Sequence, residues 1–519
     1  MSIKKIEIPD KKPELSKDDI DKLHDFYTVE RTNGQLKNIH LDRLKIVNKL
    51  REMGYLRYDL PDGNSQYVYV HDNIIEFTTD QKIIDAFEDY IKKLPVRTYE
   101  SVAPMDDGGV VQITINARMI QEVLYKNLQS YFVLDRLRPD RPITLMSDTK
   151  TEKYFYFQNT VVRVTPDDIE LVPYSHLEHK IWAHSVIKRP ITIDDGKGDF
   201  EKFIEDIAGT DDKERKKSLM SILGYLMHDF YECDLRAAFF TDVNKDTAGK
   251  AAGGTGKGII GKALGEMLNH DKGQSRYVAI AGKNLQLEKD TRYCLADMTT
   301  QLIHLEDVYK KSFDLKLLYN DITDGASIRK PYQIKPIVRY VKMMISINHT
   351  IELEGSSDLR RLIIFELANY YNDKFRPIDK FGKRFFESEW TATDWNRFYT
   401  FMCRCALTYL HDGLIDPGEV NYSERRLAES VNEDFRYWFD ELISPALIDN
   451  ERREFAKNSL FEIFTTKYPA YSDKRFRNPF TKWCKKFCEL KHIPYVEKRS
   501  TNDMLIINPT REDFLTIKK

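Results

Sequence analysis

The sequence lacks any apolar run of the roughly 20 residues that a membrane-spanning helix needs. Its start, residues 1–5, leads directly into charged sequence, so we expect neither a secretory signal nor a membrane anchor. Only 6 cysteines occur in 519 residues, too few for a disulfide framework, which favours a reducing, cytoplasmic setting. The formal net charge of −2 gives the chain as a whole no polyelectrolyte signal for nucleic acid.

A glycine-rich loop at 251–258 lies between an apolar, strand-like run at 236–240 and a helical pattern that begins near Ile260. Glycines allow backbone N–H groups to turn inward, a helix N-terminus favours anions, and Lys257 adds a full positive charge. The candidate phosphate-binding residues are Gly253, Gly254, Thr255, Gly256, Lys257 and Gly258. The layout of strand, loop and helix therefore predicts a phosphate cradle.

Two positions depart from the usual form of such a loop. Ala251 stands where the first glycine is expected, and Gly258 replaces the Ser or Thr whose hydroxyl helps to hold Mg²⁺. An ordinary flexible turn remains the alternative interpretation of this stretch taken alone.

An apolar strand at 301–305 ends in two carboxylates, Glu306 and Asp307. Hydrolysis of Mg²⁺–ATP needs one acid to orient the metal and another to polarise the attacking water. We assign Glu306 to the metal and Asp307 to the water. A strand followed by a solvated acidic turn would look the same.

Two further strand ends carry candidate site residues. Asn348 follows the apolar strand 341–347 and can bridge a γ-phosphate and the attacking water, although an Asn there can also be a simple cap. Arg360 and Arg361 precede the strand 362–365 and can neutralise transition-state charge on a neighbouring subunit's nucleotide. The alternative is a salt-bridged surface pair.

Between the acids and Asn348, residues 324–338 have the pattern of a hairpin with its tip near Pro331. Its candidate DNA-binding residues are Arg329, Lys330, Tyr332 and Lys335. Basic side chains suit a phosphate backbone, and the tyrosine can stack on a base. A solvated hairpin without a ligand is the alternative.

In this order, from Gly253 to Arg361, these features resemble superfamily 3 helicases of the primase-helicase type found in phages, plasmids and poxviruses. The resemblance implies that Lys257 binds phosphate and that Glu306 and Asp307 form the acidic pair. It also implies that Asn348 is the sensor and that Arg361, or Arg360, is the arginine finger. It further implies an AAA+ fold, with a parallel sheet between helices, ATP and Mg²⁺ as cofactors, and a hexameric ring around one DNA strand.

The C-terminal segment 451–519 holds 16 Lys and Arg against 9 Asp and Glu, which hints at an anionic partner. A helix beginning near Asn478 carries Lys482, Lys485 and Lys486 mostly off its apolar stripe, and two strand-like pieces follow it. This pattern resembles a winged helix, a module that binds duplex DNA or, in other proteins, a protein partner.

Upstream, Leu41, Leu44, Val47, Leu50 and Met53 keep helical spacing until Gly54, and two strand-like runs follow. The closely spaced acids of this half all lie in turn-like sequence, so we find no metal centre of the primase type. We expect an N-terminal α+β domain at 1–150, a β-hairpin and helical collar at 151–235, the ATPase at 236–370, a helical region at 371–450, and the winged-helix-like domain at 451–519.

The sequence therefore predicts an ATP-dependent replicative DNA helicase of a phage or mobile element that moves on single-stranded DNA as a ring. Forked DNA and a separate primase or polymerase are the expected partners, in the cytoplasm of a bacterial host. The alternative is an ATP-gated, DNA-binding replication initiator or loader that does not unwind DNA, and Gly258 favours it.

Overall fold

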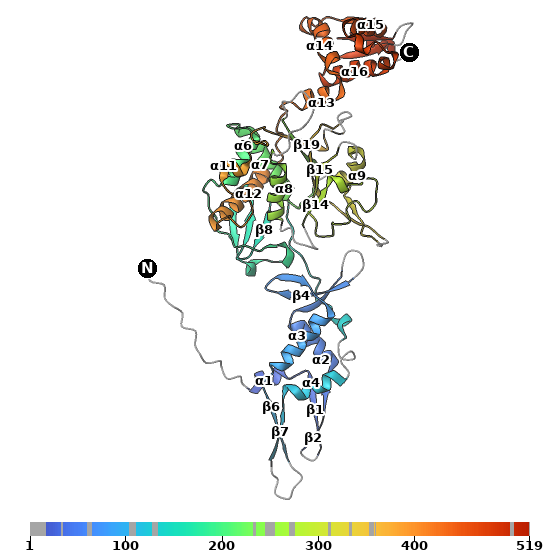
Figure 1. Cartoon of the computed structure of the whole chain (residues 1–519). Coiled ribbons are helices and arrows are strands. Elements are labelled where there is room, and N and C mark those ends of the chain that lie inside the picture. The colour runs from blue at the N-terminus through green and yellow to red at the C-terminus, as the bar shows by residue number, and fades with distance from the viewer. Residues whose placement is uncertain are drawn as a thin grey trace. The chain divides into compact units, whose positions relative to one another are not determined.

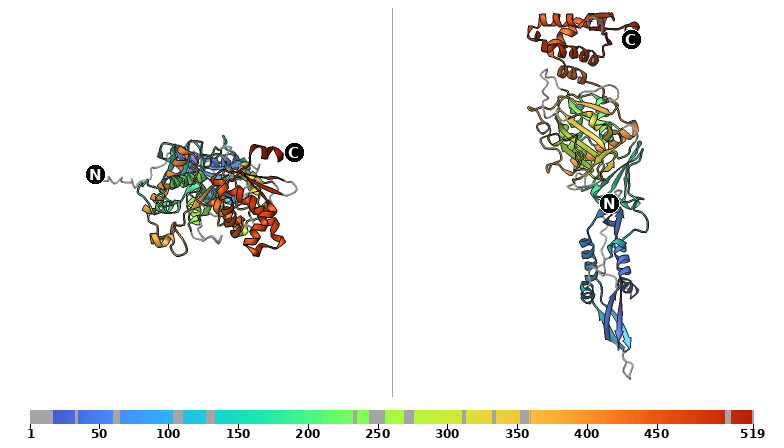
Figure 2. Two further views of the ribbon diagram at one scale, coloured as in Figure 1. Left: turned by 90° about the horizontal axis from the view of Figure 1, so that it is seen from above. Right: turned by 90° about the vertical axis from the view of Figure 1, so that its right-hand side faces the viewer.

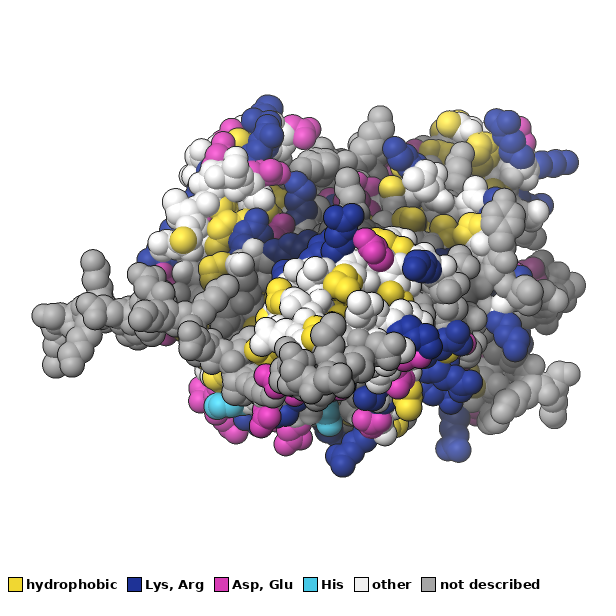
Figure 3. Space-filling view, turned by 90° about the horizontal axis from the view of Figure 1, so that it is seen from below, with side chains coloured by type: hydrophobic (Ala, Val, Ile, Leu, Met, Phe, Trp, Pro, Cys, Tyr) yellow, Lys and Arg dark blue, Asp and Glu magenta, His cyan; other side chains and the backbone are white. Residues whose placement is uncertain are grey.

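The computed structural model describes residues 17–32, 35–59, 65–102, 110–126, 133–231, 235–243, 255–268, 276–309, 313–331, 335–351, 358, 360–498 and 503–517. The chain forms two compact units, Met1–Met146 with Pro173–Ala183 and Ser147–Val172 with His184–Lys519 (Figure 1). Among the described residues no helix has the length and apolar character needed to cross a bilayer. Side chains of both charge signs are intermixed on the face seen in Figure 3, in keeping with the small net charge.

The first unit combines helices with small sheets that are antiparallel except for the parallel pair β5 and β11. Its helices are α1 Lys17–Leu23, α2 Arg43–Glu52, α3 Asp80–Lys92 and α4 Ala117–Lys126, with 3-10 turns η1 Leu134–Arg136 and η2 Tyr174–His176. Its strands are β1 Tyr27–Thr32, β2 Gln35–Leu41, β3 Tyr55–Asp59, β4 Ser65–His71, β5 Ile74–Phe77, β6 Arg97–Val102, β7 Val110–Ile115 and β11 Ile181–Trp182. Buried residues of α2, α3 and α4 form one core with β1 and β2.

The helical stripe predicted for 41–53 is partly wrong. Leu41 belongs to strand β2, and Leu44 is 70% exposed, while Ile46, Val47 and Leu50 are the buried residues of α2. The cause is the N-cap Asp42, whose carboxylate accepts the N–H groups of the first turn and so starts the helix after Leu41.

The second unit is built on a five-stranded sheet whose neighbouring strands are all parallel. The strands are β13 Ala237–Asp242, β14 Tyr277–Ala281, β15 Leu302–Val308, β18 Lys342–Ile347 and β19 Leu362–Leu367, in the order β14-β15-β18-β13-β19. All of β13 and β18 is buried, as expected for strands covered on both faces. The predicted α/β core with a parallel sheet between helices is confirmed at this level.

Alternating residues of the strands pack into two separate cores. Ala238 and Phe240 of β13 face the helices α6 Asp199–Ala208, α7 Lys213–Met227, α8 Lys257–Met267 and α12 Ala392–Asp412. Ala237 and Phe239 face the other side, which η4 Gly282–Asn284, η6 Leu315–Leu318 and α9 Tyr319–Thr323 cover. Figures 1 and 2 show the helical layer on one side of the sheet.

Smaller elements complete this unit. The β-hairpin predicted within 151–235 is present as β8 Lys153–Phe157 and β9 Val161–Val164, in a sheet with β10 Ile169–Val172 and β12 Val186–Ile187. The 3-10 turn η3 Ala183–Ser185 directly precedes β12. The predicted hairpin at 324–338 is formed by β16 Ala326–Ile328 and β17 Ile337–Arg339. Helix α11 Pro377–Phe381 precedes α12.

The C-terminal part of the second unit has a core of its own. Its helices are α13 Tyr422–Ser430, α14 Glu433–Ile448, α15 Lys457–Lys467, α16 Arg477–Leu490 and α17 Arg511–Ile517, with turns η7 Pro469–Tyr471 and η8 Lys474–Phe476. Its strands β20 Arg453–Ala456, β21 Tyr495–Lys498 and β22 Met504–Ile507 form an antiparallel sheet in the order β20-β22-β21. The free thiols of Cys484 and Cys488 are buried in this core.

Candidate functional site

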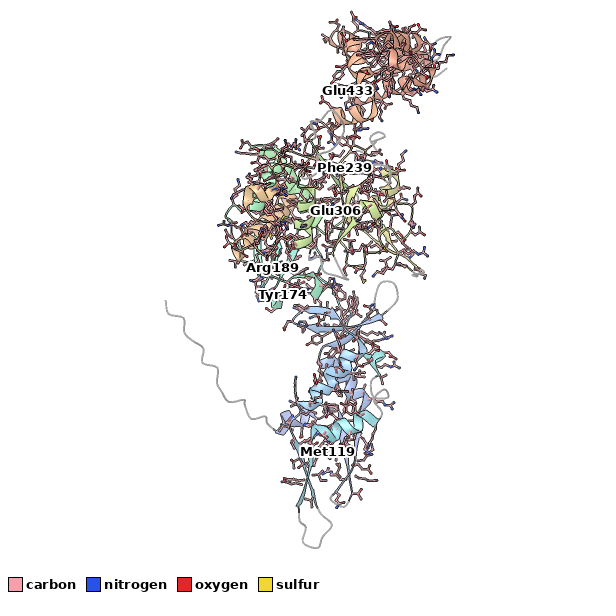
Figure 4. The ribbon with its side chains drawn as sticks, viewed as in Figure 1. Met119, Tyr174, Arg189, Phe239, Glu306 and Glu433 are labelled. Atoms are coloured by element: carbon pink, nitrogen blue, oxygen red, sulfur yellow. The ribbon has the colours of Figure 1, made fainter. Side chains whose placement is uncertain are left out.

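Three of the predicted motifs lie on adjacent strands. The glycine-rich loop follows β13, the acids lie at the end of β15, and Asn348 follows β18, which runs between the other two strands. Because neighbouring strands are parallel, all three carboxyl ends meet at one edge of the sheet, where ligands of open α/β sheets bind. Figure 4 labels Glu306 in this region.

The described part of the loop contains one residue with a left-handed backbone. Gly256 has φ of +116°, in the left-handed region, and a Cβ there would lie 2.6 Å from the ring of Phe203. Only glycine therefore fits this position, directly before α8 begins at Lys257. Gly253 and Gly254 lie outside the described residues.

Lys257 is buried and forms an ion pair that our sequence analysis did not predict. Its Nζ donates to Asp242 Oδ2 at 2.5 Å, and the hydroxyl of Thr255 donates to the other oxygen of the same carboxylate. Asp242 is the last residue of β13 and is only 2% exposed. Burial lowers the pKa of the Lys257 ammonium, while Asp242 and then Asp307 oppose this shift.

The two acids share one side of the sheet edge because β15 contains a bulge. In a regular strand Glu306 and Asp307 would point to opposite faces. The register with β18 shifts between Leu305 and Val308, and Asp307 has φ of +48°. Bulges re-aim side chains in this way, and both acids line the same pocket as Lys257.

Neighbouring residues hold this bulge in place. The backbone N–H of Asp307 donates to Ser346 Oγ at 3.2 Å, and His304 contacts the same oxygen at 3.0 Å and Tyr277 Oη at 2.7 Å. A Cβ on Gly282 would lie 2.3 Å from the carbonyl oxygen of Asp307, so this glycine permits the close approach. Burial lowers the pKa of His304 to about 4, which keeps the ring neutral.

The pocket at this edge has a volume of about 1010 Å³. Thr255, Gly256, Lys257, Gly258, Glu306, Asp307 and Asn348 line it together. The side-chain oxygen of Asn348 is buried and has no hydrogen-bond partner among the described residues. Buried acceptors are normally hydrogen-bonded, so the Asn348 oxygen is available to a donor from a water molecule or a ligand.

Gly258 has free space where a side chain would lie. A Cβ built there would have no heavy atom within 4 Å, and Gly258 has no left-handed backbone. Steric exclusion of a side chain therefore does not explain this departure from the usual loop.

The arginine pair lies at the opposite edge of the sheet. The carbonyl oxygen of Arg361 accepts from the N–H of Ala237, where β13 begins, at 2.8 Å. The six residues of β19 span about 20 Å, so Arg361 cannot reach the pocket of its own chain. The Arg361 guanidinium lies over the ring of Tyr319 at 4.6 Å, and Arg360 is exposed.

The hairpin presents two of its predicted basic residues to solvent. Lys330 and Lys335 are exposed on either side of 332–334, and Tyr332 lies outside the described residues. Arg329 forms an ion pair with Asp290 at 3.2 Å. The exposed lysines of the hairpin therefore flank the segment 332–334.

The lysines predicted on the C-terminal helix differ in their surroundings. Lys482 is exposed on α16, whereas Lys486 is half-buried. Lys485 forms an ion pair with Glu497 of β21 at 2.5 Å, and Lys457 contacts the same carboxylate. This shared acid joins the helix to the strands that follow it.

Arg425 is a second residue near the pocket that the sequence analysis missed. It lies on α13 and donates to the carbonyl oxygen of Asp242 and, at 3.1 Å, to Thr241 Oγ1. The same helix holds the chain after Asn348, since Tyr422 Oη accepts from the N–H of Ile351 at 3.0 Å. Asp242 could have been found from the sequence, because it is an acid at the end of the strand before the loop. No pattern in the sequence around Arg425 indicates its contact with that strand.

Comparisons with known proteins found only distant structural similarity. No family model matches the chain, and no curated protein sequence matches it. A solved structure of the NrS-1 C-terminal region (305–718) in its apo form is 12% identical, with a TM-score of 0.42, and the match covers 90% of this chain and 99% of that one. Drosophila ORC bound to DNA is 11% identical with a TM-score of 0.19, covering 64% and 94%. Scores this low carry no argument about function.

The buried His304 predicts a pH dependence of stability. Because its folded pKa of about 4 lies below its ordinary value, protonation favours the unfolded chain, and stability falls as pH drops from 6.5 towards 4. At pH 5 we expect a loss of about 2 kcal/mol from this group. Urea unfolding of wild type and His304→Gln at pH 7 and pH 5 checks this, with the exposed His411→Gln as the control. Equal pH sensitivity of all three proteins would contradict the prediction.

Proposed function

We propose that this chain is an ATP-dependent replicative DNA helicase, with the pocket at the carboxyl edge of the sheet as its ATP-hydrolysing site. The observation that carries the proposal is the convergence of Lys257, Glu306, Asp307 and Asn348 on one pocket from three adjacent strands. If the glycine-rich loop and the acid pair were ordinary surface turns, there would be no reason for their side chains to line one pocket.

The residues of the pocket fit Mg²⁺–ATP. The left-handed Gly256 and the N-terminus of α8 direct N–H groups at a phosphate, and Lys257 supplies a buried cation. Carboxylate oxygens are the ligands that Mg²⁺ prefers, and we assign Glu306 to it. When bound, Mg²⁺ neutralises charge that develops on the phosphates.

The other polar groups orient the attacking water. Asp307 accepts a hydrogen bond from the water and polarises it, and the bulge aims this carboxylate into the pocket. The Asn348 oxygen accepts a second hydrogen bond from the water, while its amide donates to the γ-phosphate. This role supplies the donor that the buried oxygen otherwise lacks.

The guanidinium that completes the site comes from a neighbouring copy. Arg360 and Arg361 lie at the far edge of the sheet, so they serve the nucleotide of the next subunit in a ring. A closed ring, which we take to be a hexamer, gives every pocket such a donor.

The DNA contacts are assigned to two places. Lys330, Lys335 and Tyr332 of the hairpin hold single-stranded DNA through its phosphates and bases. In the C-terminal part, a helix, a second helix with exposed Lys482 and an antiparallel hairpin support a winged helix that binds the duplex at a fork.

The second candidate is an ATP-gated replication initiator or loader that does not unwind DNA. Gly258 favours it, since the hydroxyl that usually helps to hold Mg²⁺ is absent. Strand displacement on a forked duplex, with and without ATP, separates the two, because only the helicase gives ATP-dependent displacement.

Removing the cation or the catalytic acid should abolish hydrolysis. We expect Lys257→Ala and Asp307→Asn each to lower DNA-stimulated ATP turnover by about 100-fold or more, because each removes charge stabilisation of the transition state. The matched control is Lys262→Ala, a 66% exposed lysine on the same helix and in the same pocket. Full turnover by either variant would disprove the site assignment.

Restoring the hydroxyl should strengthen Mg²⁺ binding. The space beside Gly258 accepts a side chain, so we expect Gly258→Ser to lower the Mg²⁺ concentration that gives half-maximal ATP turnover several-fold. Gly258→Ala is the control, since it adds the same Cβ, and a helix propensity gain at least as large as that of Ser, without an oxygen. An equal effect of both variants would mean that the hydroxyl is not used.

The donation of arginine between subunits predicts complementation. Lys257→Ala and the double variant Arg360→Ala/Arg361→Ala should each be inactive alone. An equal mixture should recover about a quarter of the wild-type turnover, since a random ring pairs an intact lysine with an intact neighbouring arginine at that frequency. ATP turnover of premixed subunits measures this, and no recovery would place the arginines outside the site.

A further inference from the structure

A cluster of polar and charged side chains lies at the amino-terminal edge of the sheet, where the proposed function uses no residue except the arginine pair. At its centre is Asp229, which follows α7. Its carboxylate oxygen Oδ2 accepts a hydrogen bond from Gln301 Nε2 at 2.7 Å. Arg339 Nη2 donates to both carboxylate oxygens, at 3.0 Å to Oδ2 and 3.2 Å to Oδ1. The N–H of Asp229 donates to Asp148 at 2.7 Å.

The partners of Asp229 belong to the hairpin and to the strands that reach the pocket. Arg339 is the last residue of β17, and its Nε also donates to the carbonyl oxygen of Thr300 at 2.6 Å. Gln301 directly precedes β15, which ends in the acid pair. The carbonyl oxygen of Gln301 accepts from the N–H of Lys342, where β18 begins, at 2.8 Å. The Asp229 carboxylate thus binds the hairpin base through Arg339 and the residue before β15 through Gln301, whose carbonyl in turn binds the start of β18.

The cluster is built into the unit and is largely shielded from water. Asp148 forms a buried ion pair with Lys153 at 2.8 Å, and the side chain of Lys153 is 0% exposed. The side chains of Asp229 and Arg339 are 16% and 25% exposed. Ion pairs in such surroundings are screened little and hold a defined geometry.

The hairpin offers a contrasting ion pair for comparison. Arg329 and Asp290 lie 3.2 Å apart, and the side chain of Asp290 is 78% exposed. No contact in the described structure connects this carboxylate to β15 or β18. It therefore serves as the matched control for the clamp at Asp229.

We propose that Asp229 is a positioning residue that couples DNA binding at the hairpin to ATP turnover in the pocket. It clamps the hairpin base, through Arg339, onto the start of β15 and β18, whose other ends carry Glu306, Asp307 and Asn348. A shift of the hairpin on binding DNA is then passed along β15 and β18, which are paired from Leu302 to Leu305, to the bulge that carries the acids and to Asn348. This inference rests on the proposed function.

The test is Asp229→Asn, which keeps the side-chain volume but removes the charge that holds Arg339. We expect ATP turnover without DNA and the affinity for a single-stranded oligonucleotide to stay at wild-type levels. The stimulation of turnover by that oligonucleotide should fall by about tenfold or more, a typical size for energetic coupling between sites. Asp290→Asn should keep full stimulation. Arg339→Gln, on the more exposed side of the clamp, should behave like Asp229→Asn and tests the same coupling if Asp229→Asn does not fold.

Other outcomes would overturn the inference. Wild-type stimulation in both clamp variants would show that the hairpin is coupled by another route. Loss of the DNA-free turnover in both would show a purely structural role, and turnover of the wild type that DNA does not raise would show no coupling at all. A wild-type chain with no ATP turnover in any condition would instead refute the proposed function, so the two failures are distinguishable.

Discussion

A lysine as deeply buried as Lys257 stays charged only beside a negative partner, and this constraint shapes the whole site. Asp242 provides that partner from the end of β13, and Thr255 binds the same carboxylate. Burial lowers the lysine pKa while the two nearby acids raise it. In the proposed function a triphosphate competes with Asp242 for the same ammonium, so the ion pair keeps the cation in place for its ligand.

The second constraint is steric and concerns the backbone on both sides of the pocket. Gly256 accommodates Phe203 and a left-handed turn, and Gly282 accommodates the bulge at Asp307. The bulge places two consecutive carboxylates on one side of the sheet edge, which a regular strand does not do. Both glycines therefore act on the geometry of the site without contributing a side chain to it.

The sequence predicted local elements better than their arrangement. The strands around 236–240, 301–305, 341–347 and 362–365 were expected from apolar runs, and each is present in the parallel sheet. Strand β14 was not expected, and the order that places β18 between β15 and β13 depends on packing between distant segments. The bulge, the partner Asp242 and the contacts of Arg425 depend on the same packing. The error at Leu44 is a local one. Helical spacing predicted this residue on the buried stripe, but the cap at Asp42 starts the helix after Leu41 and leaves Leu44 exposed.

The two edges of the sheet divide the work that the proposed function requires. The carboxyl edge holds the groups that bind and activate, while the amino edge holds Arg360, Arg361 and the clamp at Asp229. Strands of about 20 Å separate the edges, so no side chain of the amino edge can act on the pocket of its own chain directly. In the proposed function, the arginines therefore act on a neighbouring subunit, and the clamp acts through the strands. That proposal makes hydrolysis depend on assembly and on DNA because the length of the strands keeps the two edges apart.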